Sequence, residues 1–236
     1  MQSSVPLRAV IESYLGGRMA AHLSWRDRSA PERVPAGIAE LDALTGGLPR
    51  GSITEIHGPA SSGRSSLIAS ILAAATARQE ICAYVDSSDA FDPVSAETAG
   101  VDLARLLWIR CGGHPEHALK TADLLIQNGG FGLVVLDLGD ISTHIARRIP
   151  LASWFRFSRT IENTPTVMVM LERSHTVKTC AALTIEMRRE CVMWSGAPAC
   201  SRLLRGARLN AVLPDARTSR KSVASERTAF DVSAVR

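Results

Sequence analysis

The sequence predicts an α/β protein with a mostly parallel central sheet, helices on both faces of the sheet and antiparallel strands at one edge. From residue 52 onward, short β-prone runs alternate with longer amphipathic runs, which is the pattern of strand–helix–strand units. The short runs are too apolar for strands with one face in water, so the sheet must be covered on both sides. Near the C-terminus two β-prone runs follow each other without a helix between them, which indicates antiparallel strands.

The elements follow in chain order from these patterns. No internal repeat is detectable, so we expect them to form a single core. Strands are expected at residues 52–57, 81–86, 105–110, 132–137 and 166–171, and helices at 65–78, 114–129 and 151–163. The antiparallel edge strands are expected at 182–194 and 202–213.

The predicted core domain spans residues 36–213 and is flanked by two segments with weaker patterns. Residues 1–35 form an N-terminal helical segment and linker, because apolar side chains recur at near-helical spacing over 6–24 before a polar, proline-containing stretch. Residues 214–236 are polar, basic and aperiodic, so a disordered tail is expected. We therefore expect one folded domain with an appendage at each end.

The composition is that of a globular protein. The chain has 236 residues, of which 46% are hydrophobic and 21% charged, which excludes collagen-like and wholly disordered classes. No apolar run approaches the ~18 residues of a spanning helix, and the N-terminus lacks the basic and apolar blocks of a secretory signal. We expect a cytoplasmic protein with no membrane partner. Five cysteines without a C-x-x-C pair favour buried free thiols over a zinc site or a disulfide framework.

A glycine- and serine-rich segment between the first strand and the first long helix has the spacing of a phosphate-binding loop. It matches the G-x-x-x-x-G-K-[ST] pattern except that arginine replaces lysine. Its glycines let backbone N–H groups surround a phosphate, and the helix N-terminus adds partial positive charge. The alternative is a turn that only joins strand to helix. The candidate nucleotide-binding residues are Gly58, Pro59, Ser61, Ser62, Gly63, Arg64, Ser65 and Ser66.

The candidate metal ligands are a serine hydroxyl and an aspartate. Ser65 would offer its Oγ to Mg²⁺. Asp137 ends the apolar run GLVVLD, which is the position of the Walker-B aspartate in P-loop NTPases. Many parallel strands end in aspartate without binding anything, so Asp137 gains its weight from the phosphate loop upstream. Together the two motifs predict that ATP and Mg²⁺ bind at this end of the sheet.

Several segments, in order, resemble the RecA recombinase family over roughly residues 36–190. They are GSITEIHGPASSGRSS, CAYVDSSDAFDP, AGVDLARLL, HPEHALKTADLLIQNGG and GLVVLD. The size, the leading segment and the basic end look most like a degenerate RecA paralogue of the ImuA type. The resemblance implies a RecA-like P-loop core, ATP and Mg²⁺ as cofactors, and a role in bacterial DNA repair, recombination and the SOS response to DNA damage.

The chain departs from the family pattern at positions to which the resemblance assigns chemistry. Arg64 stands at the loop lysine, and its planar guanidinium is larger than the ammonium that fits between β- and γ-phosphates. Ser88 occupies the catalytic glutamate position, so no catalytic residue is assigned. Ser95 replaces the tyrosine that stacks on adenine. Glu172 stands at the sensor position of a glutamine, where an acid in the same orientation would repel a γ-phosphate.

In the family that the chain resembles, two loops bind DNA. The corresponding segments of this chain are short. About eleven residues, 138–148, follow GLVVLD, and about eight, 173–180, follow TVMVML. Contacts to DNA or to a protein partner are therefore assigned to arginines, with solvated surface arginines as the alternative. These arginines are Arg147, Arg148, Arg202, Arg205 and Arg208.

Three functional hypotheses follow. The first is an accessory RecA-like protein of DNA repair or damage-induced translesion mutagenesis, which binds a RecA-family recombinase or a translesion polymerase complex and hydrolyses little or no ATP. Single-stranded DNA and a second copy of the chain are further expected partners. The second is an active DNA-dependent ATPase of the recombinase family, acting in homologous recombination and the SOS response. The third is a nucleotide-independent structural paralogue.

Overall fold

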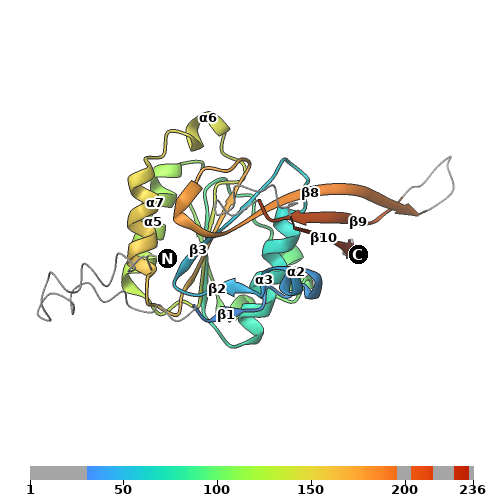
Figure 1. Cartoon of the computed structure of the whole chain (residues 1–236), viewed down its shortest axis with the longest axis horizontal. Helices are drawn as coiled ribbons and strands as arrows, with labels where there is room; N and C mark the ends of the chain where they lie inside the picture. Colours follow the sequence, from blue (N-terminus) through green and yellow to red (C-terminus); the bar gives the residue numbers. More distant parts are fainter. Residues whose placement is uncertain (1–30, 196–202, 215–225, 234–236) are drawn as a thin grey trace, which may run out of the picture. The chain divides into compact units, whose positions relative to one another are not determined.

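The structure is a computed structural model that describes residues 31–195, 203–214 and 226–233 of the chain. From Glu32 onward these residues belong to one compact unit (Figure 1). The predicted helix over residues 6–24 lies outside the described residues. The predicted start of the core at residue 36 is wrong by a few residues, because a short strand begins at Arg33 within that unit.

The described strands join into two sheets. Their bounds are β1 (Arg33–Val34), β2 (Leu48–Pro49), β3 (Ser52–His57), β4 (Cys82–Asp86), β5 (Leu106–Arg110), β6 (Leu133–Asp137), β7 (Val167–Glu172), β8 (Ala181–Ser195), β9 (Leu203–Val212) and β10 (Arg227–Ser233). Strands β1 and β2 form an antiparallel pair. In the described part of the chain the other strands form one sheet in the order β10-β9-β8-β3-β7-β6-β4-β5. Its strands from β8 to β5 are parallel, which confirms the α/β class with antiparallel strands at one edge.

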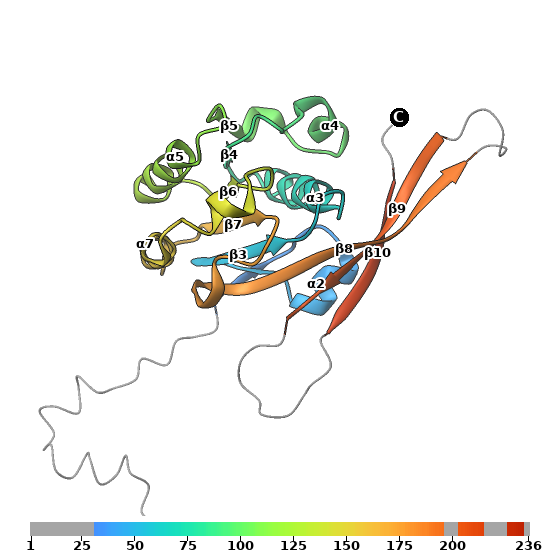
Figure 2. The same cartoon turned by 90° about the horizontal axis from the view of Figure 1, so that it is seen from above.

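Helices cover both faces of this sheet. The described α-helices are α2 (Ala39–Thr45), α3 (Arg64–Ala77), α4 (Pro93–Thr98), α5 (Pro115–Asn128), α6 (Thr143–Ala146) and α7 (Leu151–Ile161). Short 3₁₀ turns lie at Leu103–Arg105 and Lys178–Cys180. Figure 2 shows α5 and α7 together on one face and α3 on the opposite face. Two buried clusters result, one under α3 and one under α5 and α7.

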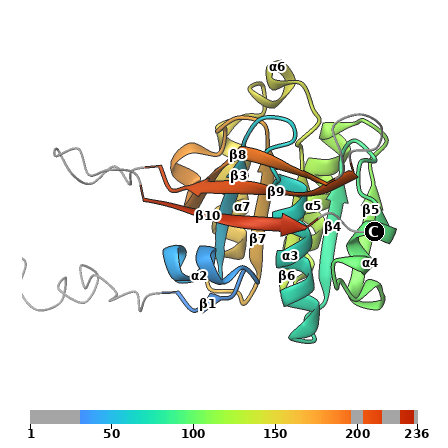
Figure 3. The ribbon, with the colours of Figure 1, turned by 90° about the vertical axis from the view of Figure 1, so that its right-hand side faces the viewer.

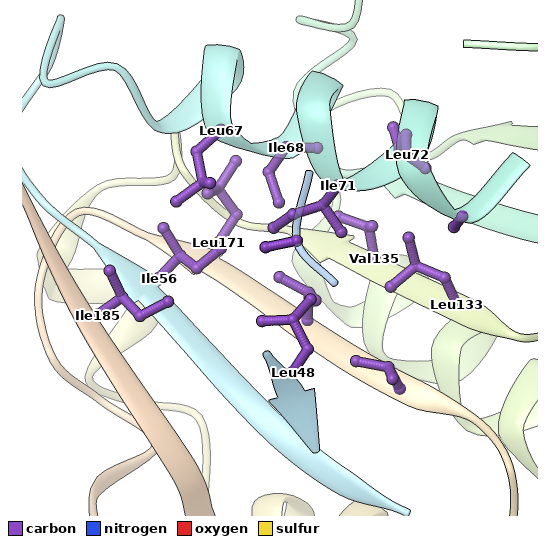
Figure 4. Packing of buried hydrophobic residues seen from close by; sticks show 14 of the residues in the cluster. Leu48, Ile56, Leu67, Ile68, Ile71, Leu72, Leu133, Val135, Leu171 and Ile185 are labelled. Atoms are coloured by element: carbon purple, nitrogen blue, oxygen red, sulfur yellow. The ribbon is translucent and has the colours of Figure 1, made fainter. Parts of the chain in front are cut away.

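The packing under α3 follows from its sequence. Leucine and isoleucine recur three and four residues apart, so they form one stripe on the helix, and no Gly or Pro interrupts it. This stripe packs against the alternating inward residues of the parallel strands (Figure 4). The labelled side chains in that view include Leu67, Ile71, Ile56, Leu171 and Val135. This packing places the start of α3 over the carboxyl ends of β3, β6 and β7.

The expectation that residues 182–194 form an antiparallel strand is wrong at its start. Strand β8 pairs parallel with β3, with Ile53 opposite Ala181 and His57 opposite Glu186, and pairs antiparallel only with β9. The segment 173–180 therefore runs back along the sheet before β8 begins. Eight residues can do this because an extended chain spans about 3.3 Å per residue. The pattern of the sequence contains no signal for this reversal, since it depends on which strand β8 meets.

The expectation of a disordered tail from residue 214 is wrong for residues 227–233. These residues form β10, which pairs antiparallel with β9, with Phe230 opposite Leu209 (Figure 3). Phe230 is buried and belongs to the cluster under α3. The segment shows no clear periodicity because an edge strand with one apolar anchor needs few apolar residues. Its order comes from pairing with β9.

Candidate functional site

The predicted phosphate loop joins β3 to α3 and lies directly against β8 and β9. Gly58 packs on the backbone of Met187, and a Cβ at residue 58 would collide with that carbonyl oxygen. Gly63 has a φ of 89°, and a Cβ there would collide with the side chain of Leu209. Both glycines of the motif are therefore required by close packing and, at Gly63, by left-handed backbone.

The loop and the first turn of α3 offer unsatisfied hydrogen-bond donors. The first N–H groups of any helix have no partner within the helix, and they point toward its N-terminus, where the helix dipole is positive. Ser62 is almost fully buried, and its Oγ has no hydrogen-bond partner among the described residues. This arrangement suits an anion such as a phosphate.

Arg64 begins α3 and turns its guanidinium toward the end of β6. The side chain is only 8% exposed. Its Nη1 and Nη2 donate long hydrogen bonds, 3.4 and 3.5 Å, to the carbonyl oxygen of Gly139. Burial lowers the pKa of Arg64, and the neighbouring carboxylate of Asp137 opposes that shift. The guanidinium is therefore a buried positive charge with donors to spare, because it carries five N–H groups.

Asp137 ends β6, and its carboxylate is held by two protein donors. The Tyr84 hydroxyl donates to Oδ2 at 2.5 Å, and the Gly139 N–H donates to Oδ1 at 2.7 Å. Burial raises the pKa of Asp137, and these hydrogen bonds oppose the shift. Arg64 lies beside the same carboxylate, since a Cβ on Gly139 would be 2.8 Å from Arg64 Nη1 and 2.9 Å from Asp137 Oδ1.

Two hollows flank the start of α3. The first, about 460 Å³, lies on the side of Asp137 and α4. The second, about 490 Å³, lies between the loop and the apolar wall of the β8–β9 hairpin. Val232 and Ser233 of β10 line both hollows. The first hollow is lined by Arg64, Ser65, Ser66, Tyr84, Ser95, Asp137 and Gly139 among others.

The segment at the expected catalytic position is held away from the first hollow. The Oγ of Ser88 lies 3.2 Å from that of Ser87. The carboxylate of Asp86 accepts hydrogen bonds from the backbone N–H groups of Ser88 and of two following residues, which fixes the loop. Asp89 forms an ion pair with Arg110 at 3.0 Å. Neither Ser88 nor Asp89 is among the residues that line the hollows. Two carboxylates besides Asp137 line the first hollow: Asp92 caps α4, and Asp140 pairs with Arg173 at 3.3 Å.

The expected sensor residue faces away from the first hollow. Leu171 lines the hollow, and Glu172, the next residue of β7, points to the opposite face of the sheet. Its Oε2 accepts a hydrogen bond from the Thr176 hydroxyl, and Oε1 has no partner among the described residues. Burial raises the pKa of Glu172 to about 8. In this orientation Glu172 does not meet a phosphate held at the loop.

Ser65 and Asp137 fit a hydrated Mg²⁺ ion poorly. Mg²⁺ requires near-octahedral oxygen ligands and keeps several of its waters. Both oxygens of Asp137 already accept hydrogen bonds, and a second cation beside Arg64 would be repelled. Within the described ranges no group of three or more His, Cys, Asp or Glu side chains could hold a metal ion. The Mg²⁺ site at these two residues stays a prediction.

The arginines assigned to DNA or a partner do not form one cluster. Arg147 and Arg148 are exposed between α6 and α7. Arg205 donates to Ser195 Oγ at 2.7 Å, and Arg208 forms a two-pronged ion pair with Asp231 that joins β9 to β10. Arg202 lies outside the described residues. Arg205 and Arg208 therefore have partners within the edge of the sheet.

Sequence reasoning missed three contributors to this site. The first is Tyr84, which the strand pattern places only within a buried strand. A buried tyrosine hydroxyl needs a hydrogen-bond partner, and this need could have indicated a polar group nearby. Gly139 carries the carbonyl that Arg64 contacts, and β10 supplies one wall. The last two had no signal in the sequence, because their place depends on contacts between distant segments.

A phosphate loop that opens a helix on a parallel sheet defines a P-loop α/β protein. A family model described as the RecA N-terminal domain matches residues 7–145, which is more than half of the chain. The chain therefore belongs to the RecA family, and its core is RecA-like. None of the helices in the described ranges is long and apolar enough to cross a membrane.

Several relatives named Protein RecA agree with this membership. The chain is 39% identical to that of Rhodopseudomonas palustris over 130 residues, which cover 54% of this chain and 37% of the relative. It is 31% identical to that of Leifsonia xyli over 181 residues, which cover 70% and 50%. It is 44% identical to that of Brucella anthropi over 108 residues, which cover 45% and 30%. The chain thus matches half or less of the length of these relatives.

Proposed function

We propose that this chain is a RecA-like accessory protein of bacterial DNA repair or damage-induced translesion mutagenesis, similar to the ImuA type. In this role it binds a nucleotide weakly through the loop 58–66 and hydrolyses it slowly or not at all. The observation that carries the proposal is the pairing of a phosphate loop that keeps both of its glycines with a serine at position 88. The loop retains a means of binding phosphate, and position 88 lacks the carboxylate from which the family would activate water.

The missing general base should lower the rate of hydrolysis by a large factor. A positioned general base accelerates a reaction typically ~10²–10⁴-fold. Ser88 has no carboxylate, its hydroxyl lies beside that of Ser87, and the adjacent Asp89 is neutralised by Arg110. The buried acid Glu172 faces the other side of the sheet. Turnover well below that of a working family member is the expected consequence.

The short segments after β6 and β7 support an accessory role. Helix α6 occupies part of the stretch between β6 and α7, and the stretch 173–180 returns directly to β8. Little chain remains for loops that would wrap DNA. Association with a RecA-family recombinase or a translesion polymerase is the corresponding proposal for the partner, with single-stranded DNA and self-association as further proposals.

Steady-state turnover tests the enzymatic half of this proposal. The full chain is assayed for phosphate release from ATP, with and without single-stranded DNA, beside a RecA protein as positive control. The expected result is ATP binding with turnover lower by about two orders of magnitude or more. Ser88→Glu alone is expected not to restore turnover, because Arg64 remains at the lysine position.

The second candidate is a working DNA-dependent ATPase that acts in recombination. The names of the matching relatives favour it, since all those given above are called Protein RecA. DNA-stimulated turnover equal to that of the positive control would establish this candidate and end the accessory proposal. Binding of purified recombinase or translesion polymerase to the full chain, but not to a chain lacking residues 1–24, would support the accessory proposal.

A further inference from the structure

Two arginine side chains supply the positive charge at the candidate site. Arg64 and Arg173 converge on one atom, the carbonyl oxygen of Gly139. Arg173 Nε donates to it at 2.9 Å, and Arg64 approaches it at 3.4 and 3.5 Å. Arg173 also pairs with Asp140 at 3.3 Å, which reduces the negative charge at the rim of the first hollow.

The carboxylate that would attract a metal ion, that of Asp137, already accepts hydrogen bonds from the protein. Asp137 is largely buried, and its two oxygens accept hydrogen bonds from Tyr84 and from Gly139. The Tyr84 ring is itself fixed by Phe91, whose centroid lies 4.5 Å away. Tyr84 Oη therefore stays on Asp137, and the guanidinium of Arg64 sits beside the same carboxylate.

We propose that this site binds the phosphate chain of a nucleotide without a divalent cation, with the Arg64 guanidinium in the place of the metal and Tyr84 holding Asp137 as a hydrogen-bond acceptor. The inference rests on the proposed nucleotide binding and specifies its chemistry. Guanidinium is weakly hydrated and planar, and its paired N–H groups match two phosphate oxygens. The long contacts of Arg64 to Gly139 leave those donors free to turn toward a ligand in the first hollow.

Calorimetric titration of the full chain tests the proposal. The ligands are a non-hydrolysable ATP analogue and inorganic tripolyphosphate, each with excess MgCl₂ and with excess EDTA. The two dissociation constants for each ligand are expected to agree within about threefold. Similar affinity for both ligands assigns recognition to the phosphates alone, and tighter binding of the analogue shows that the base and ribose also contribute.

Two variants test the roles of Arg64 and Tyr84 separately. Arg64→Gln keeps most of the side-chain volume, and it is expected to weaken both ligands in EDTA by at least about tenfold, because charge-assisted hydrogen bonds to phosphate are lost. Tyr84→Phe frees Asp137 Oδ2, and it is expected to make binding tighten when Mg²⁺ is added. Arg159→Ala removes an exposed arginine of α7 and serves as the control for loss of one positive charge.

The outcomes that overturn the proposal are distinct from those that overturn the proposed function. Binding that requires Mg²⁺, or that tightens about tenfold or more on its addition, removes this inference and leaves nucleotide binding intact. A Tyr84→Phe protein as insensitive to Mg²⁺ as the parent removes the role of Tyr84. No binding of either ligand under any condition removes both the inference and the proposed nucleotide binding.

Discussion

On the α3 face of the sheet the carboxyl ends of β3, β6 and β7 border a hollow of about 460 Å³, whereas on the α7 face the ends of β3 and β7 are closed by hydrogen bonds. The open region contains buried Arg64, and the Ser62 hydroxyl, which has no partner among the described residues, borders the second hollow on the other side of the loop. The closed region centres on Glu55, which is fully buried in β3. Both regions hold buried charge, and Arg64 of the open region lines the hollow.

The closed region is organised by Glu55. Its Oε1 accepts hydrogen bonds from the backbone N–H groups of Thr176 and Val177 at 2.8 and 3.2 Å. Its Oε2 lies 2.6 Å from Nδ1 of His175. Glu172 adds the hydrogen bond from the Thr176 hydroxyl. These contacts anchor the segment 173–180 that carries the chain back to β8.

Neighbouring residues of one strand belong here to unrelated sites. Leu171 lines the open hollow, and Glu172 belongs to the closed cluster, because side chains alternate across a strand. A buried charge with satisfied partners on a closed face stabilises a turn. A buried charge beside a hollow is available to a ligand.

Glu55→Ala should produce the largest loss of stability. It leaves two backbone N–H groups and an imidazole without their acceptor, and breaking such a buried network costs about 3–5 kcal/mol. Denaturant unfolding measures the change, with Glu116→Ala on the exposed surface of α5 as the control. The division between the regions predicts unchanged nucleotide affinity in the fraction that stays folded, and a parallel loss of affinity would contradict it.

Glu172→Gln should remove a pH dependence of stability. The pKa of Glu172 is raised to about 8 from 4.5, so the folded state holds a proton that the unfolded state releases, and stability falls as pH rises between these values. Glutamine cannot ionise. The variant should match the parent near pH 4.5 and exceed its stability above pH 8 by about 2–4 kcal/mol. Equal slopes of unfolding free energy against pH for both proteins would exclude this assignment.

Gly63→Ala should damage the open region by steric collision. The new Cβ would meet the Leu209 side chain, and overpacking of this kind costs about 1–3 kcal/mol beyond the penalty of the left-handed backbone. Gly130→Ala is the matched control, since Gly130 has a φ of 85° and nothing within 4 Å of the added atom. Thermal unfolding of the two variants gives the difference. If they lose the same stability, the loop does not depend on its contact with β9.

Ser95→Tyr should have the smallest effect and the opposite sign. Ser95 lines the first hollow. The RecA family places at this position a tyrosine that stacks on adenine. Restored stacking contributes about 0.5–1.5 kcal/mol, so the affinity for the ATP analogue should rise several-fold while that for tripolyphosphate stays constant. Thr98→Tyr, on the same helix but outside the hollow, is the control. Equal gains for both ligands would show that the new ring does not contact a base.

Much of the fold could be predicted because its signals are local. Runs such as LVVLD in β6 and CAYVD in β4 are buried throughout, as apolar parallel strands must be. The end of β6 and the start of α3 also placed Asp137 and Arg64 at one edge of the sheet. The direction of β8 and the existence of β10 could not be predicted, because each depends on the strand with which it pairs.

The sequence by its local patterns determined the alternation of strands and helices in the core and the position of the phosphate loop, because these depend on residue type and on spacing along the chain. The resemblance to the RecA family marked position 88, where serine stands in place of a carboxylate. Only the tertiary structure decided that Tyr84 holds Asp137, that Glu172 faces away from the hollow and that Arg64 meets Gly139. Those contacts join residues far apart in the chain, and they arise from strand register and helix packing. No local pattern encodes such distances, so the charge balance of the site became visible only once the sheet had assembled.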